Sequence, residues 1–146
     1  MDIIKYLQGE LEMEYTRSPG KVIGRFLSDL RDNEAVHGIR DSVTSKVYVP
    51  PQAYGPESKT KMQTIVPLSS EASISYFTVV HEKPPFTDWE PPFAFVAVEF
   101  EGAHTQLWHR MKDTKGLSIG MKVKPKFKDE NERSGSILDI DYFEPV

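Results

Sequence analysis

Four lysines alternate with other residues near the C-terminal end of the chain, at Lys122, Lys124, Lys126 and Lys128. Successive side chains of a β-strand point to opposite faces, so these lysines would form a basic stripe about 20 Å long on one face. Such a stripe can bind phosphate groups, including those of a nucleic-acid backbone. The same pattern is typical of a solvated edge strand, where lysine and proline prevent edge-to-edge pairing. Both interpretations stay open.

Aromatic side chains offer a second candidate surface. They gather around the proline-rich segment 81–92, and one further tryptophan lies in an expected strand. A tryptophan on a barrel strand is typically a core anchor, whereas a loop tryptophan is less easily buried. We therefore expect Trp89, more than Trp108, to face a ligand or another subunit. Together, the candidate ligand-binding residues are Phe86, Trp89, Trp108, Lys122, Lys124 and Lys126.

The titratable side chains do not assemble into a predicted active site. His104 and His109 lie in or near one expected strand, on opposite faces, and are expected to be surface or hydrogen-bonded residues. Asp139 and Asp141 are expected to share a strand face, but no nucleophile or phosphate-binding glycine loop accompanies this carboxylate pair. We expect no catalytic residues, and the sequence predicts that the protein is not an enzyme on its own.

Composition sets broader limits. The chain has 146 residues, a formal net charge of −4 and no cysteine, which excludes disulfides and thiolate metal sites. Proteins that neutralise many phosphates are usually basic, so the acidic balance argues against a dedicated nucleic-acid binder. The N-terminus lacks the pattern of a signal peptide, and no apolar run has the length of a membrane span. We therefore expect a cytoplasmic location.

The first part of the chain, residues 1–36, is predicted to be helical. Ile3, Ile4 and Leu7 have helical spacing and predict a short first helix. Pro19 suits the first turn of a second helix. This helix has an apolar stripe at offsets of three and four, formed by Val22, Ile23, Phe26, Leu27 and Leu30. Two interpretations of the stripe stay open: it packs on its own domain, or it faces a partner.

Residues 64–146 are predicted to form strands. The patterns favour strands near 74–80, 93–100, 105–111, 121–128 and 136–143, with a rigid loop over 81–92. The strand near 74–80 is expected to be largely buried on both faces. Five short strands with one longer connection fit an oligonucleotide/oligosaccharide-binding (OB) barrel, and they equally fit other small barrels.

Between these regions, residues 37–63 contain two pairs with the spacing of metal-binding knuckles. The pairs are Asp41-x-x-Thr44 and Gly55-x-x-Ser58. A structural zinc site requires four thiolate or imidazole ligands, and these residues cannot supply that set. We therefore expect no zinc and no other metal at these positions.

Several segments, in order, resemble the acyl-CoA-associated zinc-ribbon/OB-fold family, whose members accompany thiolases. These are Gly20–Val22, Phe26–Leu30, Val47–Pro51 with Tyr54 and Pro56, Ser75–His81, Pro91–Phe93 and Leu117–Val123. The resemblance implies a mainly β protein with a five-stranded OB barrel (64–146), preceded by N-terminal helices (1–36) and a degenerate, rubredoxin-like zinc ribbon (37–63). Without zinc, the ribbon would be held by packing of Val43, Val47, Val49 and Tyr54.

The resemblance also implies a function. It suggests a noncatalytic accessory subunit in lipid metabolism that binds acyl-CoA or partners a thiolase-like or acyl-CoA synthase enzyme. The N-terminal helix and ribbon would dock on this partner, while the OB barrel would help to enclose the thioester. No covalently bound cofactor and no membrane partner are expected. The alternative is an OB module that binds single-stranded nucleic acid, because OB folds stack bases on aromatic side chains.

Overall fold

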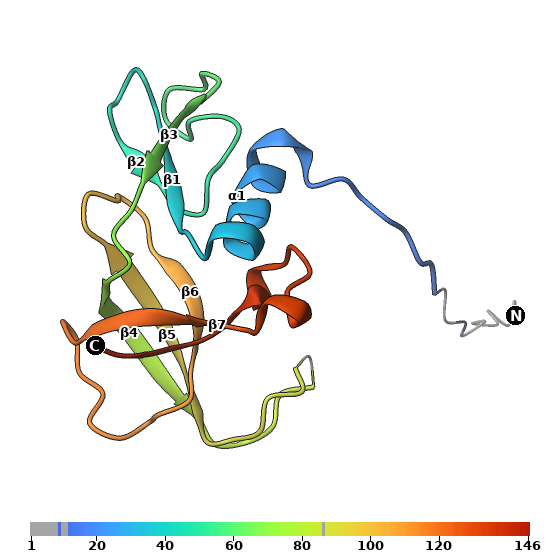
Figure 1. The fold of residues 1–146 in the computed structure, drawn as a ribbon, viewed down its shortest axis with the longest axis vertical. Helices are drawn as coiled ribbons and strands as arrows, with labels where there is room; N and C mark the ends of the chain where they lie inside the picture. The colour runs from blue at the N-terminus through green and yellow to red at the C-terminus, as the bar shows by residue number, and fades with distance from the viewer. Residues whose placement is uncertain (1–8, 10–11, 86) are drawn as a thin grey trace, which may run out of the picture.

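The computed structural model describes residues 9, 12–85 and 87–146, and within these residues it contains a barrel, a small sheet and one α-helix (Figure 1). The predicted helix around Ile3, Ile4 and Leu7 lies outside the described residues. The elements are α1 (Gly20–Asn33), β1 (His37–Arg40), β2 (Val47–Tyr48), β3 (Thr64–Pro67), β4 (Ala72–Val80), β5 (Phe93–Phe100), β6 (Leu107–Met111), β7 (Lys122–Phe127), the 3₁₀ helices η1 (Glu130–Glu132) and η2 (Ile137–Asp139), and β8 (Ile140–Pro145).

The barrel confirms the predicted OB-type architecture. Its strands close in the order β4-β5-β6-β8-β7, and β7 also pairs with β4. All neighbouring strands are antiparallel except β6 and β8, which meet in parallel at Met111 and Phe143. A register shift between Ile74 and Tyr76 bends β4, as bulges do. Beyond this shift, Tyr76 and Phe77 are exposed, so the prediction of two largely buried faces was wrong for the second half of this strand.

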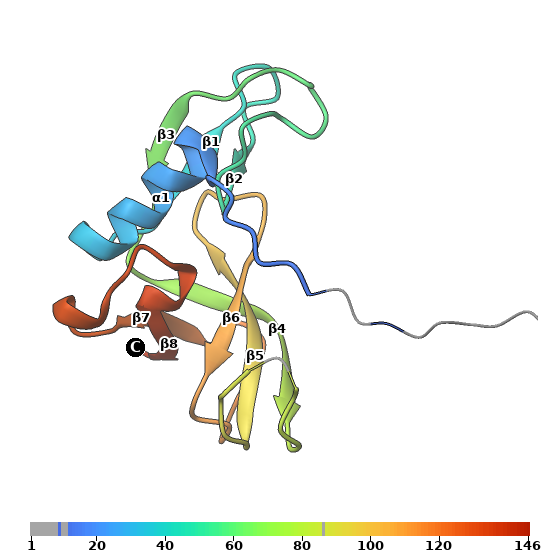
Figure 2. The same cartoon turned by 90° about the vertical axis from the view of Figure 1, so that its right-hand side faces the viewer.

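Helix α1 lies to one side of the junction between the barrel and the small sheet, in both views of the fold (Figures 1 and 2). Phe26 and Leu30, at 1% and 0% exposure, belong to the barrel's apolar core. Val22 packs instead against the apolar cluster of the small sheet. Of the two interpretations of the apolar stripe, the structure therefore shows the first: the stripe packs on its own chain.

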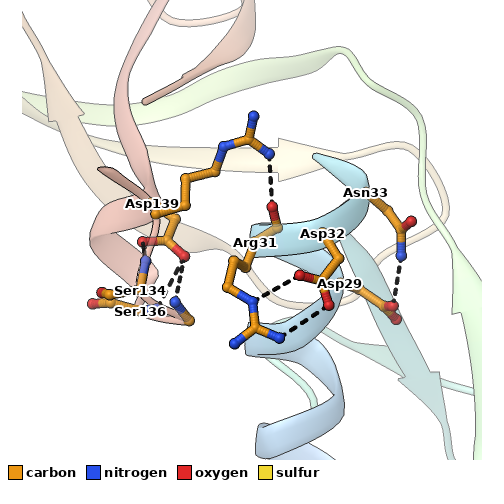
Figure 3. Close-up of polar contacts among 9 residues, drawn as sticks. Asp29, Arg31, Asp32, Asn33, Ser134, Ser136 and Asp139 are labelled. Carbon is orange, nitrogen blue, oxygen red and sulfur yellow. Dashed lines mark hydrogen bonds and ion pairs between the residues drawn. The ribbon is translucent and has the colours of Figure 1, made fainter. Parts of the chain in front are cut away.

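The C-terminal end of α1 is attached to the segment before β8. The Arg133 guanidinium donates to the Arg31 carbonyl oxygen at 2.6 Å, to Glu34 Oε1 at 2.7 Å and to the Lys128 carbonyl oxygen at 2.9 Å. Figure 3 shows Arg31 and Asp32 of α1 beside the turn that carries Asp139. One arginine thus joins the helix to the barrel.

The segment predicted as one strand over 136–143 begins instead as η2. Ser136 Oγ accepts a hydrogen bond from the Leu138 amide at 3.2 Å, which is a helix cap. The Asp139 carboxylate, buried at 1% exposure, accepts from the amides of Ser134, Gly135 and Ser136 at 2.9, 2.7 and 3.1 Å. The prediction that Asp139 and Asp141 share a strand face was therefore wrong, because local capping outcompeted the strand.

The small sheet, called the ribbon below, has the strand order β2-β1-β3. Because β3 pairs with β1 along its whole length, the sheet continues to Pro67, past the predicted division at residue 64. Val47 and Val49 are buried at 4% and 1% exposure, as predicted, but Val43 and Tyr54 are 66% and 60% exposed. Packing of these last two side chains therefore does not hold the ribbon, and the prediction was wrong for them.

Candidate functional site

A groove of about 500 Å³ lies between α1 and the ribbon. Its helix side comes from the first turns of α1, where Lys21, Val22 and Arg25 share one face because residues three and four apart are neighbours on a helix. Its ribbon side comes from β1, β3 and the segment before β3. The apolar lining residues are Val22, Ile39, Pro51, Met62 and Ile65.

The charged side chains of this groove are all cationic. Lys21, Arg25 and Lys61 line it, and no carboxylate is present among its described lining residues. Arg25 is partly neutralised, because its Nε lies 3.1 Å from Asp29 Oδ2 on the same helix. An apolar floor with a cationic rim fits a ligand that has both an apolar chain and anionic groups.

His37 forms part of the groove wall and stays uncharged at neutral pH. Its Nδ1 lies 3.2 Å from Asp29 Oδ2, and its ring meets Phe26 edge-on at 5.3 Å between centroids. Burial lowers the pKa of His37 below its ordinary value, against the opposing effect of Asp29. The positive field of the groove therefore comes from its lysines and Arg25.

The loop aromatics predicted to contact a ligand are placed differently. Phe86 lies outside the described residues. Trp89 is half-buried, with its ring edge-on to Phe93 at 5.5 Å between centroids. The Arg110 guanidinium lies over the same ring, 4.3 Å from its centroid, and also pairs with Asp141. This packing fixes the proline-rich loop to the barrel wall.

Trp108 is the more exposed tryptophan, at 58%. It lies on β6 opposite Ala97 of β5, and Ala97 in turn lies opposite Tyr76 of β4. Paired residues share a face, so the small Ala97 is covered between two large rings. The expected order of exposure of the two tryptophans was therefore wrong, since a loop can pack as closely as a strand.

The lysine stripe projects as predicted for its first three members, whereas Lys128 lies beyond the end of β7 and is half-buried. Lys122, Lys124 and Lys126 are exposed, whereas Val123 between them is fully buried. Carboxylates surround the stripe: Lys124 Nζ lies 3.8 Å from Glu144 Oε1. A hollow lined by Lys122 is lined also by Glu71, Glu99 and Glu101. Because β7 adjoins β4 and β8 rather than β6, the fold does not place the stripe beside Trp108.

The histidines of the barrel have structural contacts. His104 precedes β6, and its Nδ1 accepts a hydrogen bond from the Val47 amide at 3.1 Å. His109 is 4% exposed, and its Nε2 lies 3.3 Å from the Ile137 carbonyl oxygen. Burial lowers the pKa of His109. Within the part of the chain that the structure describes, no group of three or more His, Cys, Asp or Glu residues could hold a metal ion.

The barrel sequence matches one family model. Residues 65–128 match the model of the ChsH2 C-terminal OB-fold domain. The match covers most of the barrel of this chain, including β4 to β7. It confirms the OB-fold part of the resemblance seen in the sequence.

Two solved structures are similar to this chain in fold. A DUF35-family protein of unknown function from Sulfolobus solfataricus superposes with a TM-score of 0.61 and 19% identity, over 73% of this chain and 78% of that chain. A structure named Ltp2-ChsH2(DUF35) aldolase superposes with a TM-score of 0.60 and 18% identity, over 80% of this chain and 92% of that chain. No curated protein matches the chain. The described residues include no helix long and apolar enough to span a bilayer.

Sequence reasoning missed the groove between α1 and the ribbon. Lys21 and Arg25 flank Val22 at helical spacing, which is a signal that the sequence does carry. Lys61 and Met62 carry no such signal, because they follow a long turn and reach the helix only through the pairing of β3 with β1.

Proposed function

We propose that this chain is a noncatalytic accessory subunit that binds a thiolase-type enzyme together with its acyl-CoA. The observation that carries the proposal is the match of residues 65–128 to the family model of the ChsH2 C-terminal OB-fold domain. The fold similarity to the Ltp2-ChsH2(DUF35) aldolase, in which such a domain is named with a second protein, supports it. The resemblance of the sequence to partners of thiolases points the same way.

The groove between α1 and the ribbon suits the ligand. Its volume of about 500 Å³ lies in the range of small-molecule sites. Lys21 and Lys61 are exposed at its rim, where they would pair with the phosphates of coenzyme A. Val22, Met62 and Ile65 would contact the apolar part. The lysine stripe of Lys122, Lys124 and Lys126 is a second candidate binding site for the phosphates. The carboxylates around it would weaken its attraction for them.

The polar groups of the barrel support a noncatalytic role. His109 is buried against Ile137, Asp139 accepts three backbone amides, and Asp141 pairs with Arg110 and Lys112. General acid or base chemistry needs a group that reaches the substrate. Because these three are engaged inside the protein, the chemistry is assigned to the partner, which would cover the open side of the groove.

Co-purification tests the partnership. The tagged chain is expressed together with a thiolase-type enzyme of its source organism, and the complex is isolated through the tag. We expect the enzyme in near-equal amount, and an enzyme turnover that depends on the added chain. Recovery of the chain alone, with turnover of the enzyme unchanged, would overturn the proposal.

Direct titration tests the ligand. Octanoyl-CoA is titrated calorimetrically into the complex of wild type, of Lys21→Glu/Lys61→Glu and of Lys122→Glu/Lys124→Glu, with free octanoate as a probe that lacks the phosphates. We expect the groove variant to weaken octanoyl-CoA binding more than tenfold and the stripe variant to weaken it less. Equal affinity of wild type and groove variant would exclude the groove as the binding site.

One observation favours a second function, the binding of single-stranded nucleic acid. Tyr76 and Trp108, at 59% and 58% exposure, lie on the same outer face of the barrel on either side of Ala97. Exposed aromatic rings on an OB barrel can stack bases. Titration of a fluorescent oligothymidylate at low salt tests this function, which requires binding that weakens steeply as salt is added. The absence of a titratable signal would exclude it.

A further inference from the structure

Two turns of the ribbon have the same backbone hydrogen bonds. In the first knuckle (residues 41–46), the Asp41 amide donates to the Lys46 carbonyl oxygen at 2.9 Å, and the Ser45 amide donates to the Asp41 carbonyl oxygen at 2.8 Å. Ser45 has a positive φ of 63°. This is a tight turn around the side chain of Asp41.

The second knuckle (residues 55–60) repeats this pattern. The Gly55 amide donates to the Thr60 carbonyl oxygen at 2.9 Å, the Lys59 amide donates to the Gly55 carbonyl oxygen at 3.0 Å, and Lys59 has a φ of 57°. Left-handed backbone is uncommon for residues other than glycine, so its presence at both equivalent positions marks the same turn twice. The positions expected for metal ligands thus keep the backbone of paired knuckles.

The side chains at these positions accept hydrogen bonds from their own knuckles. Asp41 Oδ1 accepts from the amides of Val43 and Thr44, at 2.8 and 3.4 Å. Thr44 Oγ1 accepts from the Lys46 amide at 3.4 Å. In the second knuckle, Ser58 Oγ accepts from the Thr60 amide at 3.2 Å.

The carboxylate of Asp41 extends from the first knuckle into the second. It has 0% exposure, and its Oδ2 is buried without a hydrogen-bond partner that meets normal geometry among the described residues. A Cβ added to Gly55 would overlap both this Oδ2 and Ser58 Oγ, and would lie 3.0 Å from Asp41 Cγ. Asp41 therefore fills the space that a side chain at position 55 would need.

A zinc ion does not fit this set of residues. Asp41, Thr44 and Ser58 offer one carboxylate and two neutral hydroxyls, Gly55 offers no side chain, and structural zinc takes four thiolate or imidazole ligands. Since the carboxylate already fills the space beside Gly55, the chain departs from the metal site in shape as well as in donor chemistry.

We infer that the buried Asp41 carboxylate replaces the metal ion as the group that joins the two knuckles, so that the ribbon folds without metal. This arrangement also requires Gly55, because only a residue without a side chain leaves room for the carboxylate. An ion pair between Lys46 of the first knuckle and Glu57 of the second adds a second link at the surface. The Ser58 hydroxyl beside the carboxylate and the amides of Val43 and Thr44 lower the pKa of Asp41, so it is ionised at neutral pH.

Hydrogen exchange with added EDTA or zinc tests the inference in the full chain. The variants are Asp41→Ala, Asp41→Asn and Gly55→Ala. Asp113→Ala serves as the matched control, because the Asp113 carboxylate, at an exposed turn, accepts only the Lys115 amide among the described residues. We expect wild-type and control ribbon amides to keep their protection in EDTA, and Asp41→Ala and Gly55→Ala to lose it while the barrel stays protected. Asp41→Asn, which keeps an oxygen acceptor but not the charge, should lose less.

A variant that restores the metal ligands covers the case in which Asp41→Ala fails to fold. In Asp41→Cys/Thr44→Cys/Gly55→Cys/Ser58→Cys, we expect one equivalent of bound zinc and ribbon protection that is lost in EDTA. Three results would overturn the inference: stoichiometric zinc in the wild type, unchanged ribbon protection in Asp41→Ala, or no zinc binding by the four-cysteine variant.

Discussion

The barrel and the ribbon are stabilised by different means. The barrel core contains many side chains with no exposed surface, among them Phe100, Ile140 and Phe143, and α1 adds Phe26 and Leu30 to it. The ribbon's own cluster has only three buried side chains, Ile39, Tyr48 and Met62. Apolar burial scales with buried area, so the barrel can rely on it and the ribbon cannot.

This difference explains why polar groups contribute more to the stability of the ribbon than to that of the barrel. A small unit that lacks a sufficient core usually needs a disulfide or a metal. The ribbon has neither a cysteine nor a metal-binding donor set, and its knuckles meet instead around the Asp41 carboxylate. We therefore expect core mutations in the barrel to unfold the whole chain, and mutations in the ribbon to act locally.

Phe143→Ala should have the largest effect. Its ring has 0% exposure where β6 and β8 close the barrel, and truncation leaves a cavity that costs about 3–5 kcal/mol. Urea unfolding monitored by circular dichroism measures the loss. Phe143→Leu is the control and should lose less. If the ribbon amides kept their protection from hydrogen exchange while the barrel of Phe143→Ala unfolded, the ribbon would not depend on the barrel through α1.

Met62→Ala should have a smaller and more local effect. Met62 is 1% exposed in the ribbon cluster, and its truncation should cost about 2 kcal/mol, at the lower end for a buried methionine because few side chains surround it. Hydrogen exchange should show the loss in β1 to β3 and not in the barrel. Equal loss of protection in both regions would show that they unfold as one unit.

Arg133→Ala tests the attachment between helix and barrel. Removal of the guanidinium takes away its hydrogen bonds to Arg31, Glu34 and Lys128, and should lower the free energy of unfolding by about 1–3 kcal/mol. Arg133→Lys keeps the charge but cannot donate to all three and should recover only part of the loss. If Arg133→Ala were as stable as wild type, apolar packing alone would be enough to hold α1 on the barrel.

The barrel could be predicted from the sequence more fully than the ribbon. Alternation located the strand over Lys122–Phe127, because its exposed lysines alternate with more buried residues. The strand over Phe93–Phe100 is buried along most of its length, and its run of alanine and aromatic residues located it. The same reasoning failed at Ser136, where a short cap decides the backbone over three residues. The spacing of Asp41, Thr44, Gly55 and Ser58 did identify the knuckles.

The candidate site was harder to predict, because its residues meet through tertiary structure. Lys61 reaches α1 only after β3 has paired with β1, and no local pattern contains that pairing. The role of the Asp41 carboxylate was likewise hidden, since it depends on the space beside Gly55 across the ribbon. The exposures of Trp89 and Trp108 depend on packing with Arg110 and Ala97, which also lie in other elements.

Acid should weaken the barrel through His109. The Ile137 carbonyl oxygen can only accept, so Nε2 carries the proton, while Nδ1 is buried without a partner among the described residues. Burial lowers the pKa of His109, and the nearby charge of Arg110 lowers it further. Backbone hydrogen bonds and the charge of Asp141 act in the opposite direction but do not outweigh burial. The unfolded state then binds the proton more readily, and stability falls as the pH drops below the ordinary histidine value of 6.5.

Urea unfolding at pH 7.5 and at pH 5.5 measures this effect. His109→Gln should show a weaker pH dependence than wild type, whereas His81→Gln, at an exposed loop position, should not differ from it. His37 shifts in the same direction, so His109→Gln should retain part of the dependence. A free energy of unfolding that increases on acidification would contradict the lowered pKa of both His109 and His37.

Tyr48→Phe should have the smallest effect, and it should be stabilising. Tyr48 is 5% exposed in the ribbon cluster, and its hydroxyl is buried with no hydrogen-bond partner among the described residues. A buried donor without a partner costs free energy, so its removal should raise ribbon stability by up to about 1 kcal/mol. In the barrel, by contrast, the buried Asp139 carboxylate is hydrogen-bonded to three backbone amides, and Asp139→Asn should therefore destabilise. Hydrogen exchange of the ribbon amides, compared between Tyr48→Phe and wild type, measures the gain. Lower protection in Tyr48→Phe would show that the buried hydroxyl does form a stabilising hydrogen bond.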